Sequence, residues 1–287
     1  MATLRDVRRR ILSVKSTQKL TRAMKMVGSA KLRKAERALL EARPYSDKMR
    51  SVMASVSLRA EVKDRPLLKP GGGKVEFIVI TGDKGLCGAF NSNVLRFAMS
   101  SVGNLKDRQS VLYTVGKKAK DFFRRRPEFA VRGEHVGFWR TFGFSDARVV
   151  AESAVKAYTE ESYDATYLIY NEFKTALAQR VVMEQLLPVA APERPSEDTH
   201  IVDYLYEPSA SVLLDELLAQ HVEFQVFRAL LESFASEQGA RMTAMEAATD
   251  NAQDMINSLT LQYHRARQAS ITRELTEIVS GADALVR

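Results

Sequence analysis

The chain has 287 residues, with 43 Lys and Arg against 35 Asp and Glu, and 45% of its residues are hydrophobic. This length allows one or two domains with a sizeable core, and no apolar run approaches the roughly 18 residues of a membrane span. The single cysteine, Cys87, excludes an intrachain disulfide and suits a reducing compartment, and the four histidines lack the spacing of metal ligands.

The basic charge is concentrated near the N-terminus, where residues 5–37 hold twelve Lys or Arg and two acids. Helix-compatible sequence continues to about Leu58 and is interrupted only by Gly28 and Pro44. A transit peptide is also rich in arginine, but this pattern does not stop at a cleavable length. Three interpretations stay open: a solvated helix face, a helix that binds nucleic-acid phosphates, and a cationic helix that meets an acidic protein.

The stretch VEFIVITGDKGLCGAFNSNV, residues 75–94, places an apolar run before a loop with three glycines. Residues 75–81 are typical of a buried strand, and Asn91 or Asn93 is the expected N-cap of a helix that begins near Val94. A strand, a glycine loop and a helix cradle nucleotide phosphates in many folds. The spacing fits neither G-x-x-x-x-G-K-[ST] nor G-x-G-x-x-G, which favours a tight strand-to-helix turn.

In the middle of the chain, segments typical of strands alternate with segments typical of helices. Further strands are expected at 110–116, at 163–173 and within 176–189, and helices at 91–102, 117–126 and 145–160. This alternation predicts a mostly parallel sheet with helices on its faces. No nucleophile elbow, zinc-binding helix motif or carboxylate pair stands out in the sequence.

After Pro208 a helical stripe of apolar residues continues along the chain, interrupted only by Gly239 and Gly281. A helix of about 75 residues is about 110 Å long, far longer than a compact domain of this size. The N-terminal helix is the expected partner in an antiparallel coiled coil. If both helices start level at the α/β domain, the second extends beyond the first by about 20 residues, 268–287.

The expected fold class is therefore α/β, with a long antiparallel coiled coil of the N- and C-terminal helices and an inserted Rossmann-like α/β domain. The sequence favours four parts: a coiled-coil helix over 1–60, the α/β domain over 74–190, a connecting segment over 191–208 and a second coiled-coil helix over 209–287.

Six segments, in order along the chain, resemble the γ subunit of the bacterial type of F-type ATP synthase. The most specific are SVKSTQKLTRAMKMVGSAKLRKA at 13–35, ASEQGARMTAMEAATDNA at 235–252 and ITRELTEIVSGADAL at 271–285. The others are ARPY at 42–45, TGDKGLCGAFN at 81–91 and DYLYEP at 203–208. The resemblance therefore spans nearly the whole chain.

The resemblance implies a non-catalytic central rotor shaft that couples proton flow through a c-ring to conformational change and ATP synthesis or hydrolysis at the β subunits. The implied partners are the α, β, ε and δ subunits and the c-ring, with one copy of the chain per complex. It would lie at the cytoplasmic face of the bacterial membrane, associated only through the complex. No cofactor, metal ion or nucleic acid is implied. A basic coiled-coil protein that binds nucleic acid is the alternative function.

The resemblance also implies which residues meet partners. The N-terminal cations would face an acidic loop of the β subunits, and further polar residues would contact the ring of α and β subunits. These candidates are Arg8, Arg9, Lys19, Arg22, Lys25, Arg241, Gln268, Thr272 and Glu274. On the c-ring side the candidates are Tyr204 and Glu207.

Overall fold

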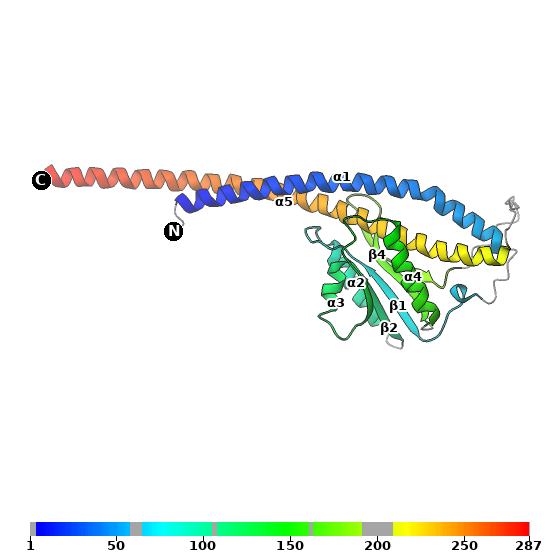
Figure 1. The fold of residues 1–287 in the computed structure, drawn as a ribbon. Helices are drawn as coiled ribbons and strands as arrows, with labels where there is room; N and C mark the ends of the chain where they lie inside the picture. Colours follow the sequence, from blue (N-terminus) through cyan, green and yellow to red (C-terminus); the bar gives the residue numbers. More distant parts are fainter. Residues whose placement is uncertain (1–3, 58–64, 105–107, 161–162, 191–208, 287) are drawn as a thin grey trace. The chain divides into compact units, whose positions relative to one another are not determined.

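The computed structural model describes residues 4–57, 65–104, 108–160, 163–190 and 209–286. The chain divides into two compact units, residues 1–27 with 242–287, and residues 28–241. Each unit contains part of two long helices, α1 (Leu4–Ser57) and α5 (Ala210–Val286), of 54 and 77 residues (Figure 1). Both helices are continuous, so Gly28, Pro44, Gly239 and Gly281 do not interrupt them as the sequence suggested.

In the first unit the two helices pair in antiparallel directions. Gln18 donates to Gln253 at 2.9 Å, and Lys25 contacts Glu246 at 2.6 Å. A step forward along α1 is matched by an equal step back along α5, so Leu4 lies level with about residue 267. The part of α5 beyond that level therefore has no described residue of α1 beside it.

The second unit is built on a five-stranded sheet with strand order β3-β2-β1-β4-β5. Its strands are β1 (Lys74–Ile80), β2 (Gln109–Val115), β3 (Ala130–His135), β4 (Tyr163–Phe173) and β5 (Gln179–Leu187). Neighbours pair in parallel except β4 and β5, which form an antiparallel hairpin. The mostly parallel sheet predicted from the alternation of strands and helices is confirmed.

Two cores cover the two faces of the sheet, and β1 alternates between them as a strand must. Phe77 and Val79 pack toward α2 (Phe90–Asn104) and α3 (Lys117–Phe123). Ile78 and Ile80 belong to the other core, with residues of α4 (Phe144–Glu160), α5 and the C-terminal part of α1. Burial on both faces explains why β1 reads as a continuous apolar run.

The parts of α1 and α5 in the second unit meet through large side chains. Met49 and Met53 of α1 share a core with Leu214 and Leu218 of α5, and further along Tyr45 lies 4.9 Å from Phe224 between ring centroids. Pro44 lies inside α1, where its ring removes one backbone hydrogen bond. Figure 1 shows this part of α1 bowed rather than straight, which is a known effect of proline within a helix.

One local prediction is wrong, and one strand was missed. The helix α2 begins at Phe90 rather than near Val94, so Asn91 and Asn93 lie inside it, and the Asn91 side chain accepts a hydrogen bond from the backbone N–H of Gly82 at 2.9 Å. The edge strand β3 was not expected, since its sequence AVRGEH has few apolar residues and is largely exposed. The amino-acid sequence of such a short, exposed edge strand gives little indication that it forms a strand.

Candidate partner-binding surfaces and the glycine loop

The N-terminal cations form an exposed basic surface on α1. Arg8, Arg9, Lys19 and Arg22 are exposed. Lys25 is half-buried, because its ammonium group pairs with Glu246 of α5. At about 100° per residue, Arg8, Lys19 and Arg22 project within about 60° of one another around α1, and Arg9 projects about 100° away from Arg8. The positive charge is therefore concentrated on one side of the helix, and one of its cations is partly neutralised within the chain.

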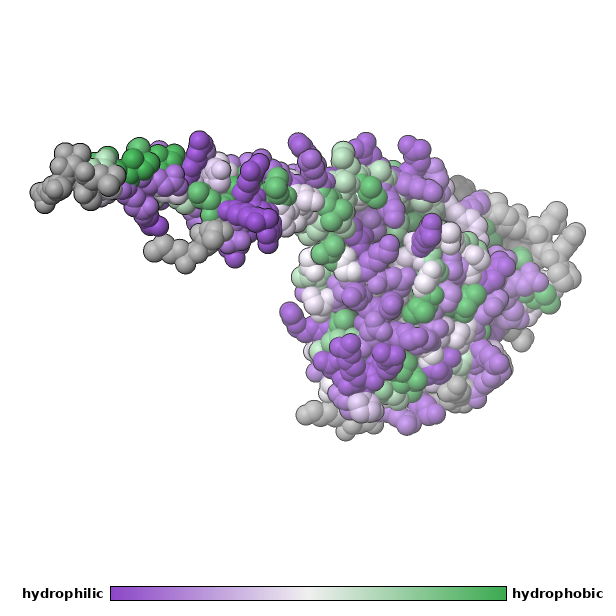
Figure 2. Space-filling view, turned by 60° about the vertical axis from the view of Figure 1, so that its left-hand side comes forward, coloured by the Kyte–Doolittle hydropathy of each residue, from purple (hydrophilic) through white to green (hydrophobic). Residues whose placement is uncertain are grey.

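The end of α5 presents apolar side chains to solvent. Every described side chain from Ile271 to Ala282 is exposed, including Leu275, Ile278 and Val279. Figure 2 shows this as green, hydrophobic surface beside purple, charged surface near the end of the helix. A clustered apolar surface of this kind is unfavourable in water and marks an interaction site.

The three candidate polar residues of this segment are also exposed. Gln268, Thr272 and Glu274 lie on the solvent-facing helix surface. Glu274 accepts a hydrogen bond from Ser270 at 3.2 Å, within the same helix. All three side chains are thus available to a partner, whereas Tyr204 and Glu207 lie outside the described residues.

Arg241 has a different environment from the other candidates. Its guanidinium is buried, lies 2.5 Å from the carboxylate of Glu237 and donates to the carbonyl of Gly85 at 3.3 Å. Burial raises the pKa of Glu237, although Arg241 opposes this shift. Within this chain, Arg241 therefore fixes the glycine loop, residues 81–89, against α5.

The polar groups of the glycine loop are used by its own fold. Asp83 accepts a hydrogen bond from the backbone N–H of Lys117 at 2.8 Å, at the start of α3, and the hydroxyl of Thr81 accepts one from Ala119 at 2.9 Å. At Gly116, where φ is +91°, a Cβ atom would lie 2.0 Å from the carbonyl oxygen of Thr81. These contacts lock the loop to the next strand-to-helix turn.

The carboxylate of Glu237 lies directly against the glycine loop. A Cβ atom at Gly82 would lie 2.8 Å from the Glu237 carboxyl group, so a larger residue here would push this carboxylate away from the loop. In sheets of this topology, ligands bind beyond the carboxyl ends of the strands where the strand order reverses, here between β1 and β4. In this chain, the helix α5 with the buried carboxylate of Glu237 occupies the position where such a ligand would bind.

Cys87 at the end of the loop is a buried thiol. Asn91 donates to its sulfur at 3.2 Å, and burial, reinforced by the charge of Glu237, raises the pKa of the Cys87 thiol. A protonated, buried thiol is a poor nucleophile. Cys87 therefore packs as a small apolar side chain.

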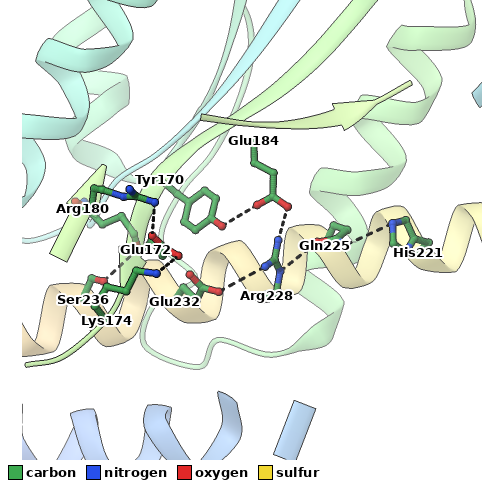
Figure 3. A network of polar contacts seen from close by, with 11 residues as sticks. Tyr170, Glu172, Lys174, Arg180, Glu184, His221, Gln225, Arg228, Glu232 and Ser236 are labelled. Carbon is green, nitrogen blue, oxygen red and sulfur yellow. Dashed lines mark hydrogen bonds and ion pairs between the residues drawn. The ribbon is translucent and has the colours of Figure 1, made fainter. Parts of the chain in front are cut away.

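The sequence did not indicate a polar network between the β4–β5 hairpin and α5 (Figure 3). Arg228 of α5 pairs with Glu184 of β5, and the hydroxyl of Tyr170 donates to the same Glu184 at 2.8 Å. Glu232, one turn after Arg228, lies 3.9 Å from its guanidinium. The spacing of Arg228 and Glu232 is a signal for a pair on one helix face, but their strand partners depend on the sheet register.

None of the described helices is long and apolar enough to cross a membrane. Among the same residues, no three His, Cys, Asp or Glu side chains gather as they would to hold a metal ion.

Known proteins match the chain over nearly its full length. A family model described as ATP synthase matches residues 3–285. The ATP synthase gamma chain of Anaeromyxobacter dehalogenans strain 2CP-C is 47% identical, covering 99% of this chain and 100% of that protein. The gamma chain of Geotalea uraniireducens strain Rf4 is 43% identical, covering 99% of each.

Solved structures share the fold. A chain from the central stalk and c-ring of the Tetrahymena thermophila mitochondrial ATP synthase is 28% identical, with a TM-score of 0.60, covering 80% of this chain and 99% of that chain. A chain of the Euglena gracilis mitochondrial ATP synthase has a TM-score of 0.71 at 20% identity, covering 98% of this chain and 94% of that chain.

Two long antiparallel helices are separated in the sequence by an α/β domain. This arrangement places the chain in the class of coiled-coil shaft proteins with an inserted sheet domain. The full-length matches then identify the family. The chain belongs to the ATP synthase gamma chain family. This membership favours the shaft function over the alternative of a nucleic-acid-binding coiled coil.

Proposed function

We propose that the chain is the non-catalytic central rotor shaft of an F-type ATP synthase. Proton flow turns the c-ring and the shaft with it, and the asymmetric shaft drives the β subunits through different nucleotide affinities. The observation that carries this proposal is the exposed apolar end of α5, in a chain that belongs to the ATP synthase gamma chain family. A long helix with an unpaired apolar end is suited to turn inside a surrounding sleeve of protein.

The apolar end supports the proposal by its energetics. Burying a side chain such as Ile271, Leu275 or Ile278 is worth about 1.5–3 kcal/mol each. A sleeve formed by the α and β subunits would remove this surface from water without a fixed set of polar contacts. Gln268, Thr272 and Glu274 would then make the polar contacts of this bearing, whereas Arg241 would meet the ring only by leaving its buried contacts with Glu237 and Gly85.

The basic surface of α1 supports a second contact in the same complex. Arg8, Arg9, Lys19 and Arg22 would face acidic loops of the β subunits, where opposite charges attract over the gap between moving parts. Lys25 would share its charge between Glu246 and that partner. These interactions are long-ranged and weakly directional, which suits a surface that must pass several partners in turn.

At the other end of the shaft, Tyr204 and Glu207 would lie against the c-ring, and ε would bind beside the α/β domain. The δ subunit would belong to the same complex, with one copy of the shaft. The chain would lie at the cytoplasmic face of the bacterial membrane and attach to it only through the complex.

The glycine loop supports a role without catalysis. A nucleotide phosphate bound at Gly82 would meet the carboxylate of Glu237, which already fills the space and repels anions. Thr81, Asp83 and Asn91 are engaged in bonds that hold the fold together. The nucleotide sites of the complex would therefore be those of its β subunits.

Co-purification tests the proposed function. The tagged chain, expressed with the α, β and ε subunits of its own organism, should recover all three in a complex that hydrolyses ATP. A matched chain with the α/β domain intact but ending at Ala266 should recover the ring subunits less well. Recovery of the chain alone, or with nucleic acid in their place, would contradict the proposal.

A further inference from the structure

The sheet and its helices α2, α3 and α4, here called the α/β domain, hold α5 through aromatic side chains. The segment between β3 and α4 carries Trp139, whose indole stacks on Phe234 of α5 with 5.8 Å between ring centroids. In the same segment, the ring of Phe142 stacks on Phe227 of α5 at 5.7 Å. Phe144, at the start of α4, meets Phe227 edge-on at 5.4 Å. Paired rings bury large areas in a defined geometry, so this aromatic contact is stiff.

The aromatic contact is itself anchored to the sheet. The indole N–H of Trp139 donates to the carbonyl of Thr81, directly after β1, at 3.1 Å. The same indole stacks on Phe138 at 4.6 Å, and both of these aromatic side chains are buried. The contact therefore connects the central strands of the sheet to α5 without a flexible side chain at either end.

A polar contact holds a different face of α5 (Figure 3). Arg228 pairs with Glu184 of β5, and the hydroxyl of Tyr170 of β4 donates to the same carboxylate at 2.8 Å. About two turns further along α5, the hydroxyl of Ser236 donates to the carbonyl of Asn171 at 3.1 Å.

The directions of these side chains show how the two contacts work together. At about 100° per residue, Phe227 and Phe234 project about 20° apart around α5, whereas Arg228 and Ser236 project about 100–180° away from them. The helix is therefore gripped on different faces. It cannot roll against the α/β domain without breaking the aromatic or the polar contact.

The hold on α5 continues to the end of the second unit. A Cβ atom at Gly239 would lie 3.1 Å from the carbonyl oxygen of Ala176 in the β4–β5 hairpin, and Arg241 donates to the carbonyl of Gly85. From there α5 continues into the first unit as one unbroken helix. A turn applied to the α/β domain therefore passes directly into the backbone of α5.

The helix α1 is held less closely over the same stretch. Met49 and Met53 anchor it in the core, but residues before them line a cavity of about 470 Å³ between α1, α5 and the end of β4. Beside this cavity Leu40 is 58% exposed and Tyr45 is 48% exposed, and Pro44 removes a backbone hydrogen bond from the helix. Side chains beside a gap lack packing partners, so this part of α1 yields more easily than α5.

We propose that the α/β domain transmits torque to α5 rather than to α1, and that the aromatic and polar contacts are the places where the torque enters. Trp139, Phe142, Arg228 and Glu184 are then positioning residues that act through α5. This inference rests on the proposed function of a rotor shaft. Loss of either contact lets the α/β domain turn through a larger angle before α5 follows, and leaves the nucleotide sites of the complex unchanged.

The angular fluctuations of a bead measure the stiffness of this connection. In a complex with α and β subunits, with the β subunits fixed to glass and no nucleotide present, a bead on Lys118→Cys reports the angle of the α/β domain, because this position is exposed at the start of α3. Adding Phe227→Ala removes the ring between Phe142 and Phe144. The variance of the bead angle should rise at least about 1.5-fold, since one of two parallel contacts is lost. Phe227→Tyr keeps the ring and should behave like the Lys118→Cys parent.

Two matched variants separate this route from a general loosening of the chain. Phe129→Ala is the same change in the core on the other face of the sheet, and Tyr45→Ala removes the ring contact of α1 with Phe224. Neither should change the variance of the bead angle. An equal rise in Phe129→Ala would overturn the inference, because the fluctuations would then follow the packing of the whole domain. An equal rise in Tyr45→Ala would overturn it by giving α1 the same share of the torque.

A second variant keeps the test decisive if Phe227→Ala does not enter the complex. Glu184→Gln weakens the polar contact instead and should raise the variance in the same way. A restrained bead with equal fluctuations in the parent and in these variants would overturn this inference alone. A bead that turns freely on the parent complex without nucleotide would contradict the proposed function and this inference together, because the end of α5 would not be held.

Discussion

Glu237 and Arg241 are one helical turn apart on α5, and both side chains are almost completely removed from water. The attraction between two such charges opposes a large desolvation penalty, so the pair is not by itself a strong source of stability. Losing one partner is a different matter, because the other charge is then buried alone. The pair is therefore a sensitive point in the contact between α5 and the glycine loop.

Arg241→Ala should lower the free energy of unfolding by about 3–5 kcal/mol, since it leaves Glu237 buried without its counter-ion. Urea unfolding can be followed through the fluorescence of the buried Trp139. Arg180→Ala removes an exposed partner of Glu172 in the same unit and should cost at most about 1 kcal/mol. The double variant Glu237→Gln with Arg241→Met should be more stable than Arg241→Ala, and equal losses for all three variants would refute this account of the pair.

Tyr158 gives the fold a dependence on alkaline pH. Burial raises the pKa of its phenol to about 12, with a smaller contribution from Asp164, and its hydroxyl donates to the carbonyl of Lys69 at 2.6 Å. The folded pKa lies above the ordinary value of 10, so the neutral phenol stabilises the fold fully below pH 10. That contribution is lost as the pH rises through about 12.

As the pH rises through this range, the free energy of unfolding of wild type should therefore fall by up to about 2–3 kcal/mol more than that of Tyr158→Phe. Urea unfolding of both proteins at several pH values from about 8 to 12 measures the difference, and the other tyrosines cancel in the comparison. Parallel stability curves for the two proteins would show that the phenol does not titrate as its burial requires.

At the scale of elements, the long helices were predictable from the sequence. The apolar stripe and the absence of proline after Pro208 indicate one helix, and the antiparallel register places its end beyond the start of α1. Glycine was a misleading signal here. At Gly239 the carbonyl oxygen of Ala176 would lie 3.1 Å from a Cβ atom, so the residue serves hairpin packing rather than a helix end. Nothing in the structure explains Gly281.

The exposed end of α5 should be dispensable for the fold and required for assembly. A chain that ends at Ala266 should keep the melting temperature of wild type, because the removed residues Ile271, Leu275, Ile278 and Val279 are exposed and bury little surface in the chain. Its incorporation into a complex with α and β subunits should fall by at least about tenfold, since several apolar contacts are lost. Thermal melting and quantitative co-purification measure the two effects.

A chain that ends at Gly281 is the matched control, since it retains Ile271, Leu275 and Ile278 and should assemble far better. Unfolding of the chain that ends at Ala266 would mean that the end of α5 packs within its own chain. Normal assembly of that chain would mean that the apolar surface is not a bearing.

The candidate surfaces were predictable where charge or periodicity marks them, as for Arg8, Arg22 and the apolar end of α5. The environment of Arg241 was not, because its contact with Gly85 joins positions 156 residues apart. The network around Glu232 was not predictable from the sequence either, because Glu184 reaches Arg228 only through the pairing of β4 with β5. The edge strand β3 lacks the alternation that would have revealed it.

The whole molecule combines three properties in one chain. Two long helices provide stiffness, the basic surface of α1 and the apolar end of α5 provide different faces for partners, and the glycine loop serves the fold. Membership of the ATP synthase gamma chain family links these properties to rotation. These properties suit the proposed rotation of the chain relative to the ring of α and β subunits.

Single-molecule observation of rotation tests this claim most directly. Cys87 is buried, so a cysteine introduced by Lys118→Cys on the exposed start of α3 can be labelled selectively with a bead. With the β subunits fixed to glass, added ATP should make the bead rotate in one direction, and rotation should stop when ATP is removed. A bead that stays still while the same complexes hydrolyse ATP, with the chain shown to be bound, would contradict the account.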